Sequence, residues 1–315
     1  MALYHGGEND VEFVPSCSSS RDLSPTREDV DLEGVFMGYL NISPALFTNL
    51  VAFKRICLVR SKRLVEGTQT PQYLAFTSVS QESVDEIDRV REEKRGWLPR
   101  MTILYDGRKE ILIVKLMVGV MHEVLAREFA RMFEAKLLCL NVSASLLATG
   151  SARFGRRGGR SKEADVSYTP LSRPLEDDAW PSLVIEAGVS ESLAMLRTDA
   201  AFWITNSDGR TRIVIVLSVN RRDRQILVER WEEDPRIRPN WSTTNYSRIP
   251  RLIQSLTLNA GVTYVGLPFE IPAQKVFDDM PENIPRGEFL FTPDSLNEFN
   301  TIVWARAPQR QQHQQ

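Results

Sequence analysis

Cysteine and histidine are scarce in this sequence, which limits the metal and redox chemistry that it can support. The chain has three residues of each type. Cys17, Cys57 and Cys139 lie far apart, so they predict no disulfide framework and favour a reducing compartment. Only His122 lies away from the two ends of the chain, so the histidines are too dispersed for a zinc site. We therefore expect an intracellular protein, cytoplasmic or nuclear.

Long apolar runs and an excess of one charge are also missing. The longest apolar run, at about residues 111–120, contains Lys115 and is too short to span a bilayer, so we expect no membrane partner. The net charge is −2, so nucleic-acid binding would depend on local basic patches. With 315 residues, of which 42% are apolar, the chain is long enough to bury a full core.

Two familiar catalytic loops are absent as well. Neither Gly150–Ser151 nor Val189–Ser190 belongs to a Gly-x-Ser-x-Gly elbow, so a serine hydrolase of that type is not supported. The glycines within residues 155–159 are not followed by Gly-Lys-Ser/Thr, so they do not form a P-loop.

The composition changes along the chain and divides it into four parts. Residues 1–32 are rich in Ser, Asp, Glu and Pro, and residues 307–315 are rich in Gln, so we expect two flexible tails. Residues 33–100 predict a helical N-terminal lobe or arm. One helix would begin at Ser43–Pro44, and a second would run from Ser80 or Ser83 to Lys94.

Residues 101–306 predict the main domain with a C-terminal extension. Asp106–Gly107 separates two apolar runs and predicts a hairpin. Apolar residues spaced three and four apart predict a helix at about residues 120–136, and similar patterns predict helices at 193–204 and from Thr292 onward. A second hairpin is expected at 212–231. The order of elements indicates an α/β fold, a mixed central sheet flanked by helices, with N-terminal helical and C-terminal additions.

One strand of this sheet carries an unusual charge. Residues 183–189 read as a buried strand, and Glu186 lies in its middle. Because side chains alternate along a strand, Glu186 shares one face with Val184 and Gly188. A carboxylate is costly to bury alone, so Glu186 lines a cleft, binds a metal or pairs with a cation. Asp165, upstream, is a second carboxylate of the same kind.

Together these motifs resemble the PD-(D/E)XK, or restriction-endonuclease-like, nuclease superfamily. The chain looks in particular like uncharacterised fungal members and, more distantly, like the Uma2-type bacterial proteins. The resemblance covers about residues 101–231. The residues that carry it are His122–Glu123, Gly150–Ser151, Lys162–Asp165, Trp180–Ser192, Asp199 with Trp203, and Glu229–Trp231.

The resemblance implies a helix–strand–strand–strand–helix–strand core with an acidic site on its second and third strands. Asp165 and Glu186 match the two acids, and Glu123 matches a glutamate that some members add to the metal site. Ala164 stands where the superfamily has proline, and Gly188 stands where it has lysine. Lys162 could replace that lysine, although in an ideal strand it points away from Asp165.

These residues predict a nuclease that depends on a divalent metal. Mg²⁺ or Mn²⁺ would lower the pKa of a bound water and neutralise charge on the phosphate, and such ions prefer carboxylate ligands. The expected metal ligands are Asp165, Glu186, Glu123 and Glu163, the last on the assumption that it shares a strand face with Asp165. The expected catalytic residues are Asp165, Glu186 and Lys162.

The partner would be DNA or RNA, held by the arginines of the glycine-rich turn, Arg153, Arg156, Arg157 and Arg160. Three alternatives stay open. The carboxylates could be ordinary ion pairs neutralised by Arg153, Lys162 or Arg197, and the arginine-rich turn could be a solvated loop. The domain could be a catalytically degenerate module that binds nucleic acid or protein. It could also hydrolyse a phosphate-bearing small molecule in a pocket closed by residues 266–286.

Overall fold

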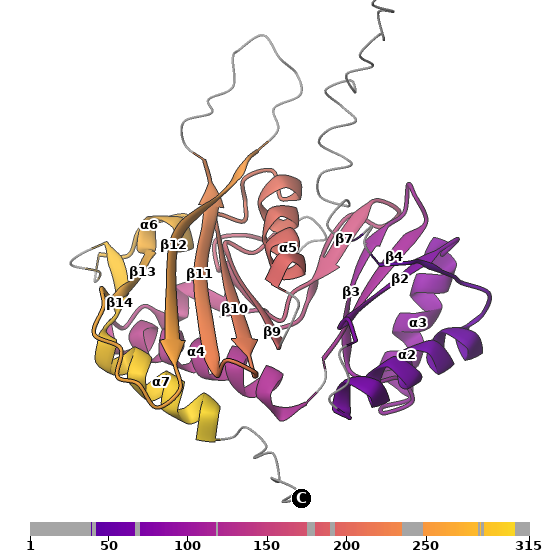
Figure 1. The fold of residues 1–315 in the computed structure, drawn as a ribbon. Coiled ribbons are helices and arrows are strands. Elements are labelled where there is room, and N and C mark those ends of the chain that lie inside the picture. Colours follow the sequence, from indigo (N-terminus) through magenta and orange to yellow (C-terminus); the bar gives the residue numbers. More distant parts are fainter. Residues whose placement is uncertain are drawn as a thin grey trace, which may run out of the picture.

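The computed structural model describes residue 39 and residues 42–66, 70–117, 119–174, 180–189, 193–234, 248–282, 284 and 287–305. Two six-stranded sheets lie side by side with helices between and outside them (Figure 1). The predicted tails at 1–32 and 307–315 lie outside the described residues. The described chain has an α/β fold with mixed sheets flanked by helices, as the sequence predicted.

The first sheet is built by the N-terminal part of the chain together with the segment around residue 160. Its strand order is β1-β2-β4-β3-β7-β6, mostly antiparallel. The strands are β1 (Ala45–Leu46), β2 (Tyr73–Thr77), β3 (Met101–Asp106), β4 (Ile111–Leu116), β6 (Arg153–Gly155) and β7 (Arg160–Glu163). The predicted hairpin at Asp106–Gly107 is confirmed as β3–β4.

The second sheet holds the strand that carries Glu186 at its centre. Its order is β12-β11-β10-β9-β8-β5, with β9 and β10 parallel and the other pairs antiparallel. The strands are β5 (Leu146–Ala148), β8 (Val166–Pro170), β9 (Leu183–Val189), β10 (Ile213–Asn220), β11 (Gln225–Glu233) and β12 (Pro250–Asn259). A separate pair, β13 (Phe269–Pro272) and β14 (Glu288–Phe291), completes the strands described.

The helices separate and cover the two sheets. They are α2 (Leu50–Val65), α3 (Gln81–Glu93), α4 (Val120–Cys139), α5 (Leu193–Asn206), α6 (Ala273–Val276) and α7 (Pro293–Ala305). A short 3-10 helix, η1 (Ser143–Ser145), follows α4. Helices α2 and α3 cover the outer side of the first sheet, α4 and α7 lie against the second, and α5 lies between the sheets (Figure 1).

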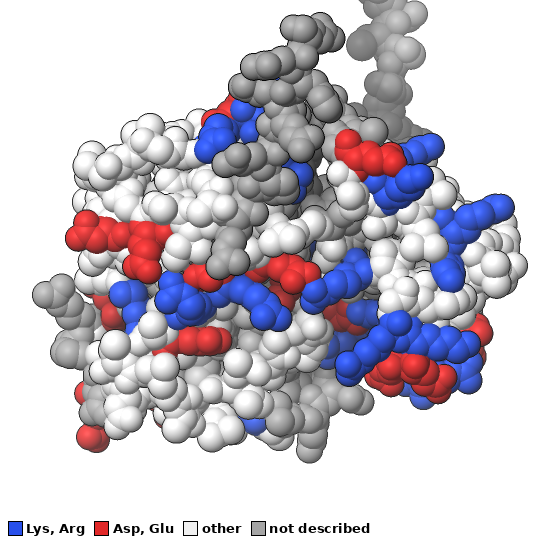
Figure 2. All heavy atoms as spheres, turned by 90° about the horizontal axis from the view of Figure 1, so that it is seen from below, with Lys and Arg blue, Asp and Glu red and all other residues white. Residues whose placement is uncertain are grey.

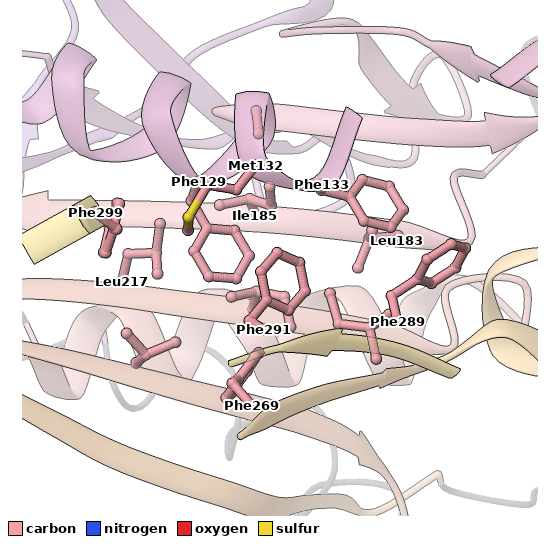
Figure 3. Packing of buried hydrophobic residues seen from close by; sticks show 14 of the residues in the cluster. Phe129, Met132, Phe133, Leu183, Ile185, Leu217, Phe269, Phe289, Phe291 and Phe299 are labelled. Carbon is pink, nitrogen blue, oxygen red and sulfur yellow. The ribbon is translucent and has the colours of Figure 1, made fainter. Parts of the chain in front are cut away.

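Three apolar clusters fill the spaces between these layers. In the first, Phe129 and Phe133 of α4 pack on Leu183 and Ile185 of β9 and on aromatic residues of β13 and β14 (Figure 3). The second joins both sheets to α5, and the third joins the first sheet to α2 and α3. Burial of this much apolar surface is the main stabilising contribution to the fold.

Most of the helices and strands that were predicted from regularly spaced apolar residues are confirmed. The expected strand at 183–189 is β9, the helix after Ser80 is α3, and the helices at 120–136 and 193–204 are α4 and α5. The second hairpin is β10–β11.

The N-terminal lobe requires correction. It is not purely helical, because Ala45–Leu46 pairs with Phe76–Thr77 as parallel strands. The first helix therefore begins at Leu50, and Asn49 caps it by accepting a hydrogen bond from the backbone N–H of Ala52 at 2.9 Å. Strand β2 then pairs with β4, so strands of the predicted N-terminal lobe and of the predicted main domain lie in one sheet.

Candidate functional site

Strand alternation directs charged side chains from both sheets toward the space beside α5. On β9, Leu183, Ile185 and Ala187 pack in the cluster with α4, whereas Val184 packs on α5. Glu186 lies two residues after Val184, so its side chain points to the same face of the strand and toward α5. The same rule applies to β4, where Ile113 faces α5, and its neighbour two residues on is Lys115.

Asp165 lies where the chain passes from one sheet to the other. Strand β7 ends at Glu163 in the first sheet, β8 begins at Val166 in the second, and Asp165 forms the bend between them. The bend interrupts the alternation of side chains. Lys162 and Asp165 therefore enter the same buried space, although an ideal strand would separate them.

Five charged side chains meet in this space, and we call them the central cluster: Lys115, Lys162, Asp165, Glu186 and Asp199. The Lys115 ammonium lies 2.5 Å from Asp165 Oδ2 and 2.7 Å from Glu186 Oε2. The Lys162 ammonium lies 2.7 Å from Asp199 Oδ1 and 3.5 Å from Glu186 Oε1. All five residues are at most 7% exposed.

Neutral groups add further hydrogen bonds to the central cluster. Trp203 Nε1 donates to Glu186 Oε1 at 2.7 Å, and Tyr73 donates to Asp199 Oδ2 at 2.7 Å. The backbone N–H of Ala187 donates to Asp165 Oδ2 at 2.8 Å. Tyr39, from the N-terminal part of the chain, donates to Asp199. The charges are thus paired and hydrogen-bonded, as burial requires.

Burial and neighbouring charges shift the two acids in opposite directions. Burial alone would raise the pKa of Asp165, but Lys115 and His122 outweigh it and hold that pKa well below its usual range. Burial raises the pKa of Glu186, and the two lysines offset this only in part, because Asp199 and Asp165 add negative charge nearby. Burial disfavours the charged form of Lys115, but the three carboxylates raise its pKa above the ordinary value.

Two buried atoms at the central cluster, Asp165 Oδ1 and His122 Nδ1, have no hydrogen-bond partner among the described residues. His122 is fully buried in the first turn of α4, and its Nε2 lies 3.1 Å from the carbonyl oxygen of Ala187 and 3.5 Å from Asp165 Oδ2. Asp165 Oδ1 is therefore an acceptor in the central cluster that no cation or donor of the described chain uses.

The structure places the other two predicted metal ligands elsewhere. Glu123 is 35% exposed at its side chain and pairs with Arg100. Glu163 points to the opposite face of β7 from Lys162, where its oxygens accept from Arg91 at 2.8 and 3.0 Å and from Arg153 at 2.8 Å. The expectation that Glu163 shares a face with Asp165 is wrong, because the chain bends between them.

A divalent metal does not fit the donor set as it stands. Such a metal needs several oxygen ligands, but both Glu186 oxygens and Asp165 Oδ2 are already bound by ammonium or N–H groups. Among the described residues, no group of three or more His, Cys, Asp or Glu side chains is arranged to hold a metal. A metal could enter only if Lys115 left its position.

The arginines of the glycine-rich turn, which joins β6 to β7, are engaged in ion pairs. Arg153 pairs with Asp88 at 2.5 Å, Arg157 pairs with Asp85, and Arg160 pairs with Asp106 at 3.0 Å. Arg156 also has an interaction partner. On the face seen from below in Figure 2, Lys and Arg side chains again lie beside Asp and Glu side chains.

The segment predicted to close a substrate pocket lies beside a different cavity. This cavity of about 330 Å³ is lined by Phe277, Asp278 and Asp279 from that segment, together with residues near Pro170 and Ser145. No residue of the central cluster lines it. The alternative of a small-molecule phosphatase pocket over the two acids therefore gains no support from this geometry.

Sequence reasoning missed Lys115 and assigned no role to Asp199, Trp203, Tyr73 or Tyr39. Lys115 could have been found, because a single lysine in an apolar strand is the same signal that identified Glu186. Asp199 could not have been placed, because a carboxylate on a helix usually faces solvent.

The comparisons with known proteins do not place the chain in a family. No protein-family model matches it, and a search of the curated proteins found no match. Among the described residues, no helix is both long and apolar enough to cross a membrane.

Proposed function

We propose that this chain is a catalytically degenerate member of the PD-(D/E)XK superfamily that serves as a macromolecular interaction module. The observation that carries the proposal is the position of Lys115. Its ammonium lies between Asp165 and Glu186, in contact with both. A tethered cation therefore stands where the nuclease chemistry would need a divalent metal.

The element order supports the superfamily part of the proposal. The resemblance implied a helix–strand–strand–strand–helix–strand core, and α4, β5, β8, β9, α5 and β10 follow one another in that order, with β6 and β7 inserted in the other sheet. The four strands are neighbours in one sheet, and the two acids lie at β9 and directly before β8.

The burial of the central cluster supports the degenerate part. A phosphodiester must reach the acids to be hydrolysed, but Glu186 and Asp199 are fully buried. The ion pairs of Arg153, Arg157 and Arg160 reduce the charge available for phosphate contacts. A protein partner is therefore favoured over nucleic acid.

A second function, a Mg²⁺- or Mn²⁺-dependent nuclease, is favoured by one observation. Lys115 and Lys162 both reach the acids, so they supply the lysine that Gly188 does not. In this reading the described state is closed, and Lys115 would move aside to orient the attacking water. Asp165→Ala or Glu186→Ala would then abolish metal-dependent cleavage of DNA or RNA.

Metal binding separates the two functions. Manganese binding is measured by electron paramagnetic resonance and calorimetry on the full chain, with DNA and RNA cleavage assayed in Mg²⁺ and Mn²⁺. The degenerate module binds no Mn²⁺ at the central cluster and does not cleave. In Lys115→Ala the freed carboxylates gain Mn²⁺ binding, which Lys115→Ala/Glu186→Gln loses again.

Lys94→Ala, which removes an exposed lysine, is the matched control and should gain no Mn²⁺ binding. The proposal is overturned if the wild-type chain binds Mn²⁺ and cleaves nucleic acid, and if Asp165→Asn abolishes both. The wild-type measurement decides between the functions even if Lys115→Ala fails to fold.

A further inference from the structure

Helix α2 exposes aliphatic side chains on the face that points away from the protein. Its buried residues are Phe53 and Cys57, which pack on the first sheet. On the opposite face, Val51 and Val65 are each 71% exposed, and Leu58 is 41% exposed. A surface helix usually presents polar residues there, so this face is unusual.

The spacing of these residues forms a single stripe. Val51, Leu58 and Val65 are seven residues apart, so they lie almost in line on successive pairs of turns. Arg55 and Lys62 follow Val51 and Leu58 by four residues and therefore lie on the same face. We call these five residues the α2 stripe.

The α2 stripe is not needed to attach the helix to the protein. The contacts that attach α2 come from its other face, where Phe53 packs on Phe76 at a ring separation of 4.9 Å and Cys57 is fully buried. Aliphatic side chains at heptad spacing are the kind of residue through which one helix packs against another. Within α2 there are five basic residues and no acidic one.

We propose that the α2 stripe docks an acidic amphipathic helix of another protein. Aliphatic side chains of the partner would pack against Val51, Leu58 and Val65, as apolar seam residues do in a pair of helices. Glutamate or aspartate side chains would pair with Arg55 and Lys62. Lys62 pairs with Glu66 at 3.8 Å, and both side chains are largely exposed, so a partner's carboxylate can replace Glu66 at little cost.

A second copy of this chain fits the α2 stripe poorly. Pairing two α2 helices would bring Arg55 and Lys62 of one copy near the same cations of the other, and like charges at an interface are unfavourable. An acidic helix has the complementary charge.

A lipid surface fits less well for a different reason. An interfacial helix needs an apolar face free of charge that can enter the headgroup boundary. In the α2 stripe, Arg55 and Lys62 alternate with the aliphatic residues instead of lying at the rim. Carboxylates that reach in between the apolar contacts satisfy this pattern, whereas a lipid surface does not.

The proposal goes beyond the proposed function and uses no residue of the central cluster. Its test uses the full chain and a synthetic 21-residue amphipathic helix with leucine at heptad positions and glutamate beside them. Binding is measured by fluorescence anisotropy and compared with a peptide of the same composition in scrambled order. We expect the ordered peptide to bind at least tenfold more tightly.

Two variants locate the binding. Val51→Ser/Leu58→Ser should weaken binding at least tenfold, whereas Val262→Ser/Val265→Ser, which changes aliphatic residues that are 59% and 87% exposed elsewhere, should leave it unchanged. The variant Arg55→Glu/Lys62→Glu should no longer bind the acidic peptide and should instead bind a version of it in which lysine replaces glutamate. Circular dichroism confirms that each variant is folded.

Several results would overturn the proposal. Equal binding of ordered and scrambled peptides would show attraction by charge alone. Concentration-dependent dimerisation that Val51→Ser/Leu58→Ser abolishes would identify a second copy as the occupant, and tighter binding to vesicles of anionic lipid than to the peptide would identify a membrane surface. A zero-length crosslink within one chain, from Lys62 to a carboxylate of residues 1–38, would assign the α2 stripe to the chain's own N-terminal segment.

Discussion

Lys162 and Glu163 are neighbours on β7, yet they belong to two different ion clusters on opposite faces of the first sheet. Lys162 points inward to the central cluster. Glu163 points outward to what we call the outer cluster, Asp88, Arg91, Arg153 and Glu163. The outer cluster pairs acids with arginines that are 24–26% exposed at their side chains, whereas both lysines of the central cluster are at most 3% exposed.

The difference shows how the surroundings decide what an ion cluster does. In the outer cluster, water reaches the guanidinium groups, so losing one partner leaves the others solvated. In the central cluster the side chains are shielded from bulk solvent, so each charge depends on its partners. The central cluster also joins both sheets and α5, whereas the outer cluster joins one sheet to α3.

The largest effect is expected from Lys115→Ala. It leaves Asp165 and Glu186 buried without their shared cation, which should lower the free energy of unfolding by about 3–5 kcal/mol. Urea unfolding monitored by tryptophan fluorescence measures this. Lys94→Ala should change the free energy by less than about 0.5 kcal/mol. Equal effects of the two substitutions would show that the central cluster is hydrated.

The pH dependence of the two buried acids should differ in sign. Asp165 has a lowered pKa in the folded protein, so its contribution to stability is present above its unfolded pKa of about 3.9 and is lost as the pH falls below it. The stability gap between wild type and Asp165→Asn should therefore shrink in acid.

Glu186 has a raised pKa in the folded protein, so its ionised form costs stability as the pH rises past the unfolded value. The free energy of unfolding of Glu186→Gln should consequently increase relative to that of the wild type as the pH rises from 4 toward neutrality. Parallel pH curves for the two variants, measured by urea unfolding, would contradict the opposite environments of these acids.

A smaller loss is expected when the outer cluster is broken by Glu163→Gln. The substitution removes the charge that Arg91 and Arg153 share, but it keeps an oxygen for the backbone N–H of Ile103 at 3.1 Å. We expect a loss of about 1–3 kcal/mol that shrinks in 1 M salt, because the arginines are partly exposed. An unchanged loss in salt would mean that the outer cluster is as dry as the central one.

The smallest effect is expected from Arg157→Ala. Its pair with Asp85 lies at the surface, with side chains 74% and 41% exposed. Exposed pairs contribute little, so the urea midpoint should not change measurably. A clear shift would show that the glycine-rich turn depends on this pair for its conformation.

The sequence was informative where apolar residues recur at regular spacing or where a single charge interrupts an apolar strand. The strand around Glu186 and the helix after Ser80 follow from patterns a few residues long. Strands β2, of five residues, and β12, of ten, were missed, because a strand is identified by the separate segments of the chain with which it pairs. Asp165 and Glu186 were brought together as predicted, at 2.5 and 2.7 Å from one ammonium.

The predictions about Lys162 and Glu163 that were wrong depend on a single bend in the chain. Strand alternation placed Glu163 with Asp165 and directed Lys162 away, and both placements reversed because the chain turns at Asp165 to enter the second sheet. No local pattern marks where a strand leaves one sheet for another. The lysine in β4 stands out as a lone charge in an apolar strand, but its two partners could not be predicted, since they are 50 and 71 residues away in sequence.

The insertion of β6 and β7 into the first sheet has a consequence for synthesis on the ribosome. Strand β3 forms its second edge only when residues 160–162 have emerged, more than fifty residues after it. Lys115 acquires its ion-pair partners Glu186 and Asp199 later still, when those residues have been translated. We therefore expect the nascent N-terminal part to remain incompletely folded until about two thirds of the chain has been translated, and to depend on chaperones during that interval.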